Sequence, residues 1–193
     1  MLINSRPVRA TLQYLAAENS GAAVYHASQA GGVAADHDGS YDMREVEIRD
    51  GRGETFDLDS AGFMLADHAS SVTNWHDDAV LSQIYEAEAK ALVRRITGAR
   101  RIEVFDHTRR AASDSLRRNQ VMREPSSVIH NDYTPWSAER RLRDILPGEA
   151  EMLLSRRFAI VNIWRSIAGR VETNPLAFCD SRTLADGDLV EVT

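Results

Sequence analysis

The sequence predicts an α+β fold arranged around an antiparallel sheet. Strand-like and helix-like segments follow one another in mixed order, without the regular β-α-β alternation that is typical of a parallel sheet. One long helical pattern and several short apolar runs bounded by turn residues support this prediction. The chain has 193 residues, of which 43% are apolar, which is enough for one domain with its own core. We expect a single domain over residues 1–193, with a loosely organised part at 1–43 and a core at 44–193.

The first strands are expected after a loop. Residues 27–39 are rich in Ala, Gly and Asp and are typical of a loop. Residues 44–49 alternate between apolar and charged side chains, which predicts a strand. A turn at residues 50–53 then leads to a second short strand near residues 55–58, so this region is expected to form a hairpin.

The strongest helical pattern covers residues 77–97. Apolar residues recur there at helical spacing, and Gly98 is placed to end the helix. Residues 101–105 have the pattern of a strand, residues 111–126 are polar and irregular, and β-character resumes at residues 127–132.

The C-terminal third predicts an interrupted helix followed by strands. Residues 136–156 are helical in pattern, with Ser137 as a candidate cap for the first segment and Pro147 opening the second. Residues 158–164 form the most apolar run and predict a strand in the sheet interior. A further strand is expected at residues 176–179.

Composition excludes several classes of protein. The net charge of −6 disfavours a nucleic-acid surface. Cys179 is the only cysteine, so the chain holds neither an internal disulfide nor a cluster of thiolate ligands, as is usual in a reducing compartment. No apolar run approaches the roughly 20 residues that cross a membrane. We therefore expect a cytoplasmic protein that binds neither nucleic acid nor a membrane.

The motif with the clearest chemistry is His130-Asn131-Asp132 at the end of a β-like run. On a strand, side chains two positions apart point the same way, so His130 and Asp132 would share a face. An imidazole nitrogen and a carboxylate oxygen are two ligands of the facial triad that binds Fe(II), whose third ligand is a second histidine. Taken alone the motif is weak, because two residues at a fixed spacing often occur by chance.

Several blocks along the chain closely resemble the CmcJ/NvfI family, also described as AsaB-like hydroxylase/desaturases. The resemblance covers essentially the whole chain with its blocks in order. The blocks lie at residues 48–52, 56–59, 62–63, 96–99, 105–110, 128–135, 157–165 and 174–182.

This resemblance implies a double-stranded β-helix core, of the jelly-roll or cupin-like kind, with flanking helices. It also implies a non-haem Fe(II)/2-oxoglutarate-dependent oxidoreductase of secondary metabolism, of the hydroxylase or desaturase type, that acts on a small-molecule substrate. Carried over by position, the metal ligands are His130 and Asp132, and the cofactors are Fe(II) and 2-oxoglutarate.

Four other side chains are candidates for the site, each with a plainer alternative. Arg165 follows an apolar run and could clamp the cosubstrate carboxylate, or form an ion pair at a strand end. Asn162 is polar within an apolar run, so it either makes an internal hydrogen bond or faces the pocket and cofactor. Tyr133 and Trp136 could line a substrate pocket, or could simply pack in the core.

The sequence departs from the family pattern in one respect. None of its six histidines follows His130, whereas the family's distal histidine and its 2-oxoglutarate-binding arginine lie further towards the C-terminus. Three explanations are open. The chain is a fragment whose closing strands are missing; His107 substitutes as the third ligand; or the chain is a non-catalytic relative. The last would be an accessory protein to a methyltransferase or methoxylation system.

Overall fold

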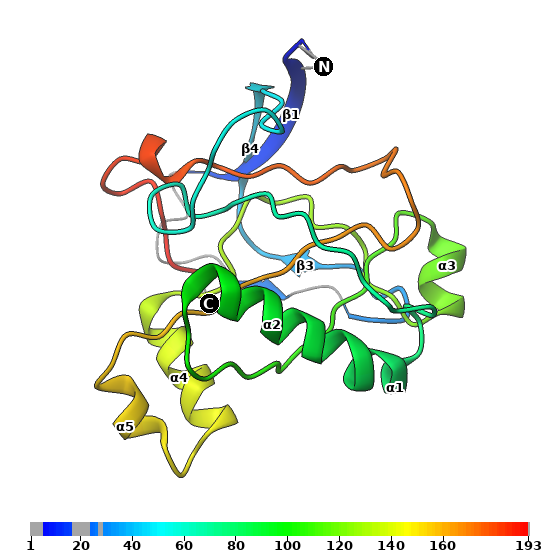
Figure 1. The fold of residues 1–193 in the computed structure, drawn as a ribbon. Helices are drawn as coiled ribbons and strands as arrows, with labels where there is room; N and C mark the ends of the chain where they lie inside the picture. Colours follow the sequence, from blue (N-terminus) through cyan, green and yellow to red (C-terminus); the bar gives the residue numbers. More distant parts are fainter. Residues whose placement is uncertain (1–5, 17–23, 27–28, 193) are drawn as a thin grey trace. The chain divides into compact units, whose positions relative to one another are not determined.

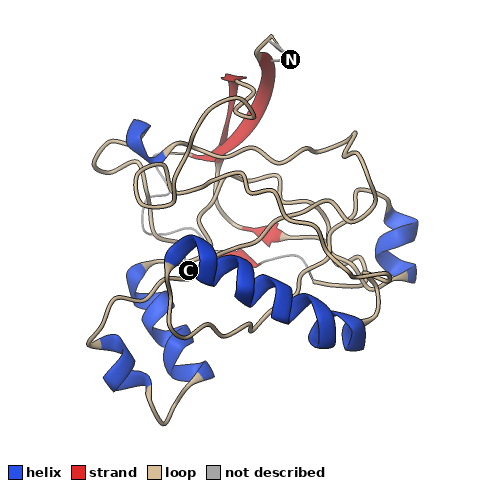
Figure 2. Ribbon diagram, viewed as in Figure 1, coloured by secondary structure: helices blue, strands red, loops and turns tan. Residues whose placement is uncertain are grey.

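The computed structural model describes residues 6–16, 24–26 and 29–192 (Figures 1 and 2). The chain divides into two compact units. Unit 1 comprises Met1–Asp67, Thr108–His130 and Glu172–Thr193, and unit 2 comprises His68–His107 and Asn131–Val171. The boundary therefore falls inside the His-x-Asp motif, between His130 and Asn131. The expectation of a single domain stays a prediction.

Unit 1 contains an antiparallel ribbon of β1 (Val8–Leu15) and β4 (Tyr41–Ile48), which lie side by side in Figure 1. The register pairs Val8 with Ile48 and Leu15 with Tyr41. The predicted strand at residues 44–49 is confirmed, and it begins earlier than expected. β1 lies within residues 1–43, where the sequence predicted a loosely organised part.

A second, shorter pairing joins β2 (Tyr25–His26) to β3 (Asp36–His37). The predicted loop at residues 27–39 therefore contains β3, while its first two residues lie outside the described part of the chain.

The predicted strand at residues 55–58 is wrong, because the chain turns there. The Asp57 carboxylate accepts hydrogen bonds from the backbone N–H groups of Asp59, at 3.0 Å, and Ser60, at 2.8 Å. Such a local bond offers the backbone an alternative to a sheet ladder. Residues 111–126 were also expected to be irregular, but they contain α3 (Asp114–Asn119), whose N-cap Ser113 accepts from Leu116 N.

The long helix of unit 2 confirms the helical prediction for residues 77–97. It runs as α1 (Asp78–Val80), a π-helical turn η2 (Leu81–Tyr85) and α2 (Glu86–Thr97). Asp77 caps its N-terminus by accepting from two backbone N–H groups. Gly98 ends it in the left-handed conformation, with φ of 70°. Its apolar face is buried at four residues, Leu81, Tyr85, Ala89 and Leu92.

The interrupted helix at residues 136–156 is confirmed as α4 (Pro135–Ile145) and α5 (Ala150–Leu154). The N-cap of α4 is Thr134 rather than Ser137. Ser137 instead completes a capping box, because its hydroxyl accepts from Thr134 N while its own N–H donates to the Thr134 hydroxyl.

The apolar run at residues 158–164 is not a strand, and Figure 2 shows loop where the sequence predicted the sheet interior. Trp164 is 51% exposed, and Phe158, Val161 and Ile163 are exposed as well. A strand needs a neighbour to accept and donate its ladder hydrogen bonds, and within the described residues this run has none.

The strands predicted at residues 101–105 and 176–179 are wrong for the same reason, and only one residue of 127–132 forms a β-bridge. The described part of the chain thus has mixed helices and strands, but with two-stranded ribbons in place of a larger sheet. Its helices are all too short or too polar to cross a membrane.

Candidate functional site

His130 is held at the end of a short connection to β1 in unit 1. Val128 bridges Gln13 of β1, and Ile129 N donates to the Gln13 carbonyl at 3.0 Å. The His130 Nδ1 atom lies 2.8 Å from the Val128 carbonyl oxygen and 3.3 Å from Ser126 Oγ. Because a carbonyl only accepts, Nδ1 carries the proton in this contact, and in a neutral imidazole the lone pair is then on Nε2.

Asp132 lies at a bend in unit 2 and bonds to the apolar run at residues 158–164. Its Oδ2 atom accepts a hydrogen bond from the side-chain amide Nδ2 of Asn162. Asn162 therefore makes the hydrogen bond that one interpretation of its position required. Because residues 129–132 do not form a strand, the strand geometry that put His130 and Asp132 on one face is absent.

The chemistry of both side chains suits an iron ion. Metal-bound histidines usually donate their other ring N–H to a carbonyl or carboxylate, and ligating carboxylates are themselves hydrogen-bonded. The contacts of His130 and Asp132 follow both patterns. No group of three or more His, Cys, Asp and Glu side chains in the described ranges is arranged to hold a metal ion. His107 lies 3.5 Å from Glu86 Oε1 through its Nε2 atom, so it pairs with a carboxylate on α2.

Arg165 is packed against the start of the long helix in unit 2. Its guanidinium carbon lies 4.8 Å from the centre of the Trp75 ring and 5.7 Å from that of Tyr85, and Nη2 donates to the His68 carbonyl at 3.0 Å. The Nε and Nη1 atoms are buried and have no hydrogen-bond partner among the described residues. Burial raises the pKa of the Tyr85 hydroxyl, and the charge of Arg165 partly opposes this shift. Arg165 thus stacks on two aromatic rings and donates to a carbonyl, and among the described residues it does not form the ion pair that was its alternative role.

The two aromatic pocket candidates differ in their surroundings. Tyr133 is half-buried against Phe105, with ring centres 6.5 Å apart, and its hydroxyl accepts from Arg141 Nε at 3.3 Å. Trp136 is 68% exposed and is stacked under Arg140. Tyr133 therefore packs against its neighbours, whereas most of the Trp136 side chain is exposed.

A shallow cavity of about 260 Å³ lies in unit 1 and was not predicted. Arg117, Glu124, Ser126 and Asn174 are among the residues that line it. Arg117 already donates to the carbonyls of residues 111 and 112, so its charge is largely engaged. In the sequence, only the Asn174-Pro175 turn pointed to this region. In the structure, Asn174 lines the cavity and has a φ of 47°.

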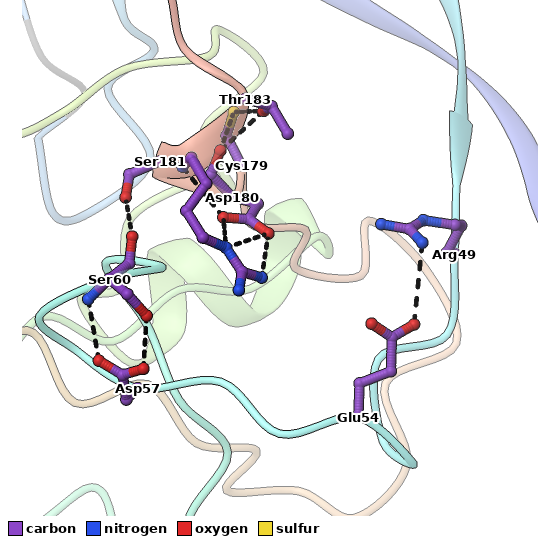
Figure 3. A network of polar contacts seen from close by, with 9 residues as sticks. Arg49, Glu54, Asp57, Ser60, Cys179, Asp180, Ser181 and Thr183 are labelled. Carbon is purple, nitrogen blue, oxygen red and sulfur yellow. Dashed lines mark hydrogen bonds and ion pairs between the residues drawn. The ribbon is translucent and has the colours of Figure 1, made fainter.

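A polar network in unit 1 joins two of the sequence blocks that carry the family resemblance (Figure 3). The Asp57 carboxylate accepts a hydrogen bond from the Ser60 hydroxyl, and the Ser181 hydroxyl donates to the Ser60 carbonyl at 2.7 Å. Asp180 binds the Arg182 guanidinium through both carboxylate oxygens. The hydrogen bonds from Ser60 lower the pKa of Asp57, and Arg182 lowers that of Asp180.

Stacked rings reinforce the same junction. The Phe63 ring lies 4.6 Å from that of Phe56 and 5.1 Å from that of Phe178, centre to centre. The two blocks are thus bound to each other by side chains and by the bond from Ser181 N to the Ala61 carbonyl. This cluster gives the two blocks a structural role, since their contacts hold two segments of unit 1 together.

Comparison with known proteins identifies the class. Residues 12–193 match a family described as "Oxidoreductase/YMDC permease-like domain". The chain is 34% identical over 167 residues to hydroxylase/desaturase CTB9 of Cercospora beticola, covering 77% of this chain and 50% of that protein. It is 31% identical over 153 residues to the Fe(II)/2-oxoglutarate-dependent dioxygenase nvfI of Aspergillus novofumigatus, covering 75% and 54%.

A solved structure supports the fold. The iron and alpha-ketoglutarate-dependent endoperoxidase NvfI superposes with a TM-score of 0.64 at 23% sequence identity, over 78% of this chain and 56% of that one. The chain therefore belongs to the oxidoreductase family named above, of the CmcJ/NvfI type. It spans about half the length of the curated relatives it matches.

Proposed function

We propose that this chain contributes two metal ligands, His130 and Asp132, to a non-haem Fe(II)/2-oxoglutarate-dependent hydroxylase or desaturase of secondary metabolism. The relatives named for this activity and the contacts of the two ligands support the proposal. The single observation that carries it is the contact of His130 Nδ1 with Val128 O, since metal-bound histidines usually donate their other ring N–H to a carbonyl or carboxylate.

The complete site would need a third ligand, and the described residues do not supply one. We infer that a third ligand and the strands closing a double-stranded β-helix come from further polypeptide, as the half-length match to the relatives suggests. The run at residues 158–164, apolar and unpaired within the described residues, would then be an inner strand of that sheet.

When bound, the iron would let 2-oxoglutarate and O2 react to give succinate and CO2, with the second oxygen atom spent on a C–H bond of a small organic substrate. His130 and Asp132 would hold the ion. The two unpaired N–H donors of Arg165 would be available to a cosubstrate carboxylate only after the Trp75 and Tyr85 rings move aside.

An anaerobic dialysis experiment tests the proposal. Iron retained by the chain should increase when 2-oxoglutarate is present, because its keto and carboxylate oxygens fill open positions on the metal. The His130→Ala and Asp132→Ala variants should lose this increase. After O2 is admitted, imidazole added in place of the missing histidine should raise succinate formation. Iron retention that is the same in all three proteins would contradict the proposal.

A second candidate is a non-catalytic accessory protein. It is favoured by the finding that the described residues hold no three-ligand metal group. This candidate predicts that neither iron nor 2-oxoglutarate binds at the motif, so the dialysis experiment separates it from the oxygenase.

A further inference from the structure

The side chain of Asn162 meets Asp132 in unit 2 although 30 residues separate them in sequence. Asn162 Nδ2 donates to Asp132 Oδ2, so this oxygen is engaged by an amide that carries no charge. A carboxylate offers about four lone-pair positions on its two oxygens, and the hydrogen bond from Asn162 uses one of them. It also restricts rotation of the carboxylate about its χ2 angle.

The segment that carries Asn162 is anchored by Arg165, three residues further along the chain. Residues 158–164 have no ladder hydrogen bonds in the described structure, so the run is not held by a sheet. Arg165 instead anchors its end through the His68 carbonyl and the rings of Trp75 and Tyr85. The anchor uses a buried guanidinium, whereas Asn162 and Asp132 are exposed.

We propose that Asn162 is a positioning residue that holds the Asp132 carboxylate in the orientation required to ligate the metal, with Arg165 anchoring the segment that carries it. This inference rests on the proposed function in assigning Asp132 to a metal. The hydrogen bond itself does not depend on that assignment, so the two can fail separately. Substituting such outer partners typically weakens metal binding by about 10- to 100-fold. Because Asn162 is exposed, we expect about tenfold.

The first arm of the test follows the amide of Asn162 by NMR in the metal-free chain. One Nδ2 proton should lie downfield of those of Asn119, an exposed asparagine at the end of α3. The Asp132→Asn variant should move the Asn162 signals and leave those of Asn119 in place. Asn162 signals that match those of Asn119 and ignore this substitution would overturn the proposal.

The second arm measures Mn²⁺ affinity of the full 193-residue chain by electron paramagnetic resonance. Asn162→Ala should bind about tenfold more weakly. Asn162→Gln, which keeps the amide donor, should recover most of the loss, and the matched control Asn119→Ala should bind as the unsubstituted chain does. An Arg165→Ala variant should resemble Asn162→Ala if the anchor acts through that amide.

Each outcome of the metal titration decides something. If His130→Ala abolishes binding and Asn162→Ala leaves it unchanged, the positioning role is wrong while the proposed function stands. If His130→Ala binds normally, or if no variant binds Mn²⁺, the proposed metal site is wrong and the positioning role falls with it, whatever the amide signals show.

Discussion

Glu88 on α2 shows how a single side chain ties the long helix to the preceding loop. Its carboxylate accepts from the Ser70 hydroxyl at 2.5 Å and from Ser71 N at 2.7 Å. These bonds, the one from Ser70 foremost, lower the pKa of Glu88 below its ordinary value of 4.5. A carboxylate whose pKa is lowered by folding stabilises the fold above the unfolded-state pKa, and this contribution is lost as the pH falls through the folded-state pKa.

We predict that Glu88→Gln lowers the free energy of unfolding at neutral pH and that the difference from the unsubstituted chain vanishes in acid. Urea denaturation over a pH series measures this. Glu172→Gln, at an exposed glutamate, is the matched control. Its free energy of unfolding should change between neutral and acid pH by the same amount as that of the unsubstituted chain. A deficit for Glu88→Gln that persists below the folded-state pKa would show that packing, not ionisation, is the cause.

The sequence predicted His130 and Asp132 as metal ligands by type and spacing, and this stays a prediction. It gave Asn162 either an internal hydrogen bond or a place facing the pocket. It could not identify Asp132 as the partner in that hydrogen bond. Residues 30 apart are brought together by the fold, and the fold differs here from the predicted sheet. The roles of Arg165, Tyr133 and Trp136 stay predictions, since their contacts are those of packed or exposed side chains.

The helices were the most predictable elements. Asp77 and Gly98 mark the ends of the long helix in the sequence itself, because capping depends on nearby residues. The π-helical turn at Leu81–Tyr85 left no such mark. Strands depend on partners distant in sequence, which the local pattern does not reveal. The runs at 101–105, 158–164 and 176–179 were therefore predicted as strands from their pattern alone, and they are loops within the described residues.

The left-handed end of α2 gives a prediction with an internal control. Gly98 has a φ of 70° and no atom within 4 Å of a Cβ placed on it, so Gly98→Ala would add backbone strain without a clash. We expect it to destabilise the chain by about 1 kcal/mol. Gly148 has the same open surroundings without a positive φ, so Gly148→Ala should be neutral or stabilising by up to about 1 kcal/mol. Thermal unfolding of both variants measures the contrast, and equal effects would contradict it.

Hydrogen exchange tests the unpaired apolar run. The amides of residues 158–164 should exchange near the unprotected rate, while those in the middle of α2 (Glu86–Thr97) should be protected by helical hydrogen bonds. Mass spectrometry after pepsin digestion compares the two segments in one sample. Protection of 158–164 equal to that of α2 would mean that the run is paired as a strand in this chain.

For the whole molecule, the family membership was predictable from ordered blocks of sequence, and the match over residues 12–193 confirms it. The α+β class is confirmed in its mixture of helices and strands and by the likeness to NvfI, whereas the double-stranded β-helix stays part of the proposal. A sheet of that kind closes only when all its strands are present, and the chain spans about half of its relatives. Under the proposed function, one cause would account both for the strands that lack partners and for the absence of a three-ligand metal group within the described residues.

The most direct test of the metal site is Mn²⁺ added in small steps to the ¹⁵N-labelled chain. A bound paramagnetic ion broadens the signals of nearby nuclei, so we predict that the backbone amides around His130 and Asp132 disappear first. The His130→Ala variant should keep these signals at the same metal concentration. Broadening that begins at acidic surface residues elsewhere, or that is the same in the variant, would contradict the claim that this motif holds the metal.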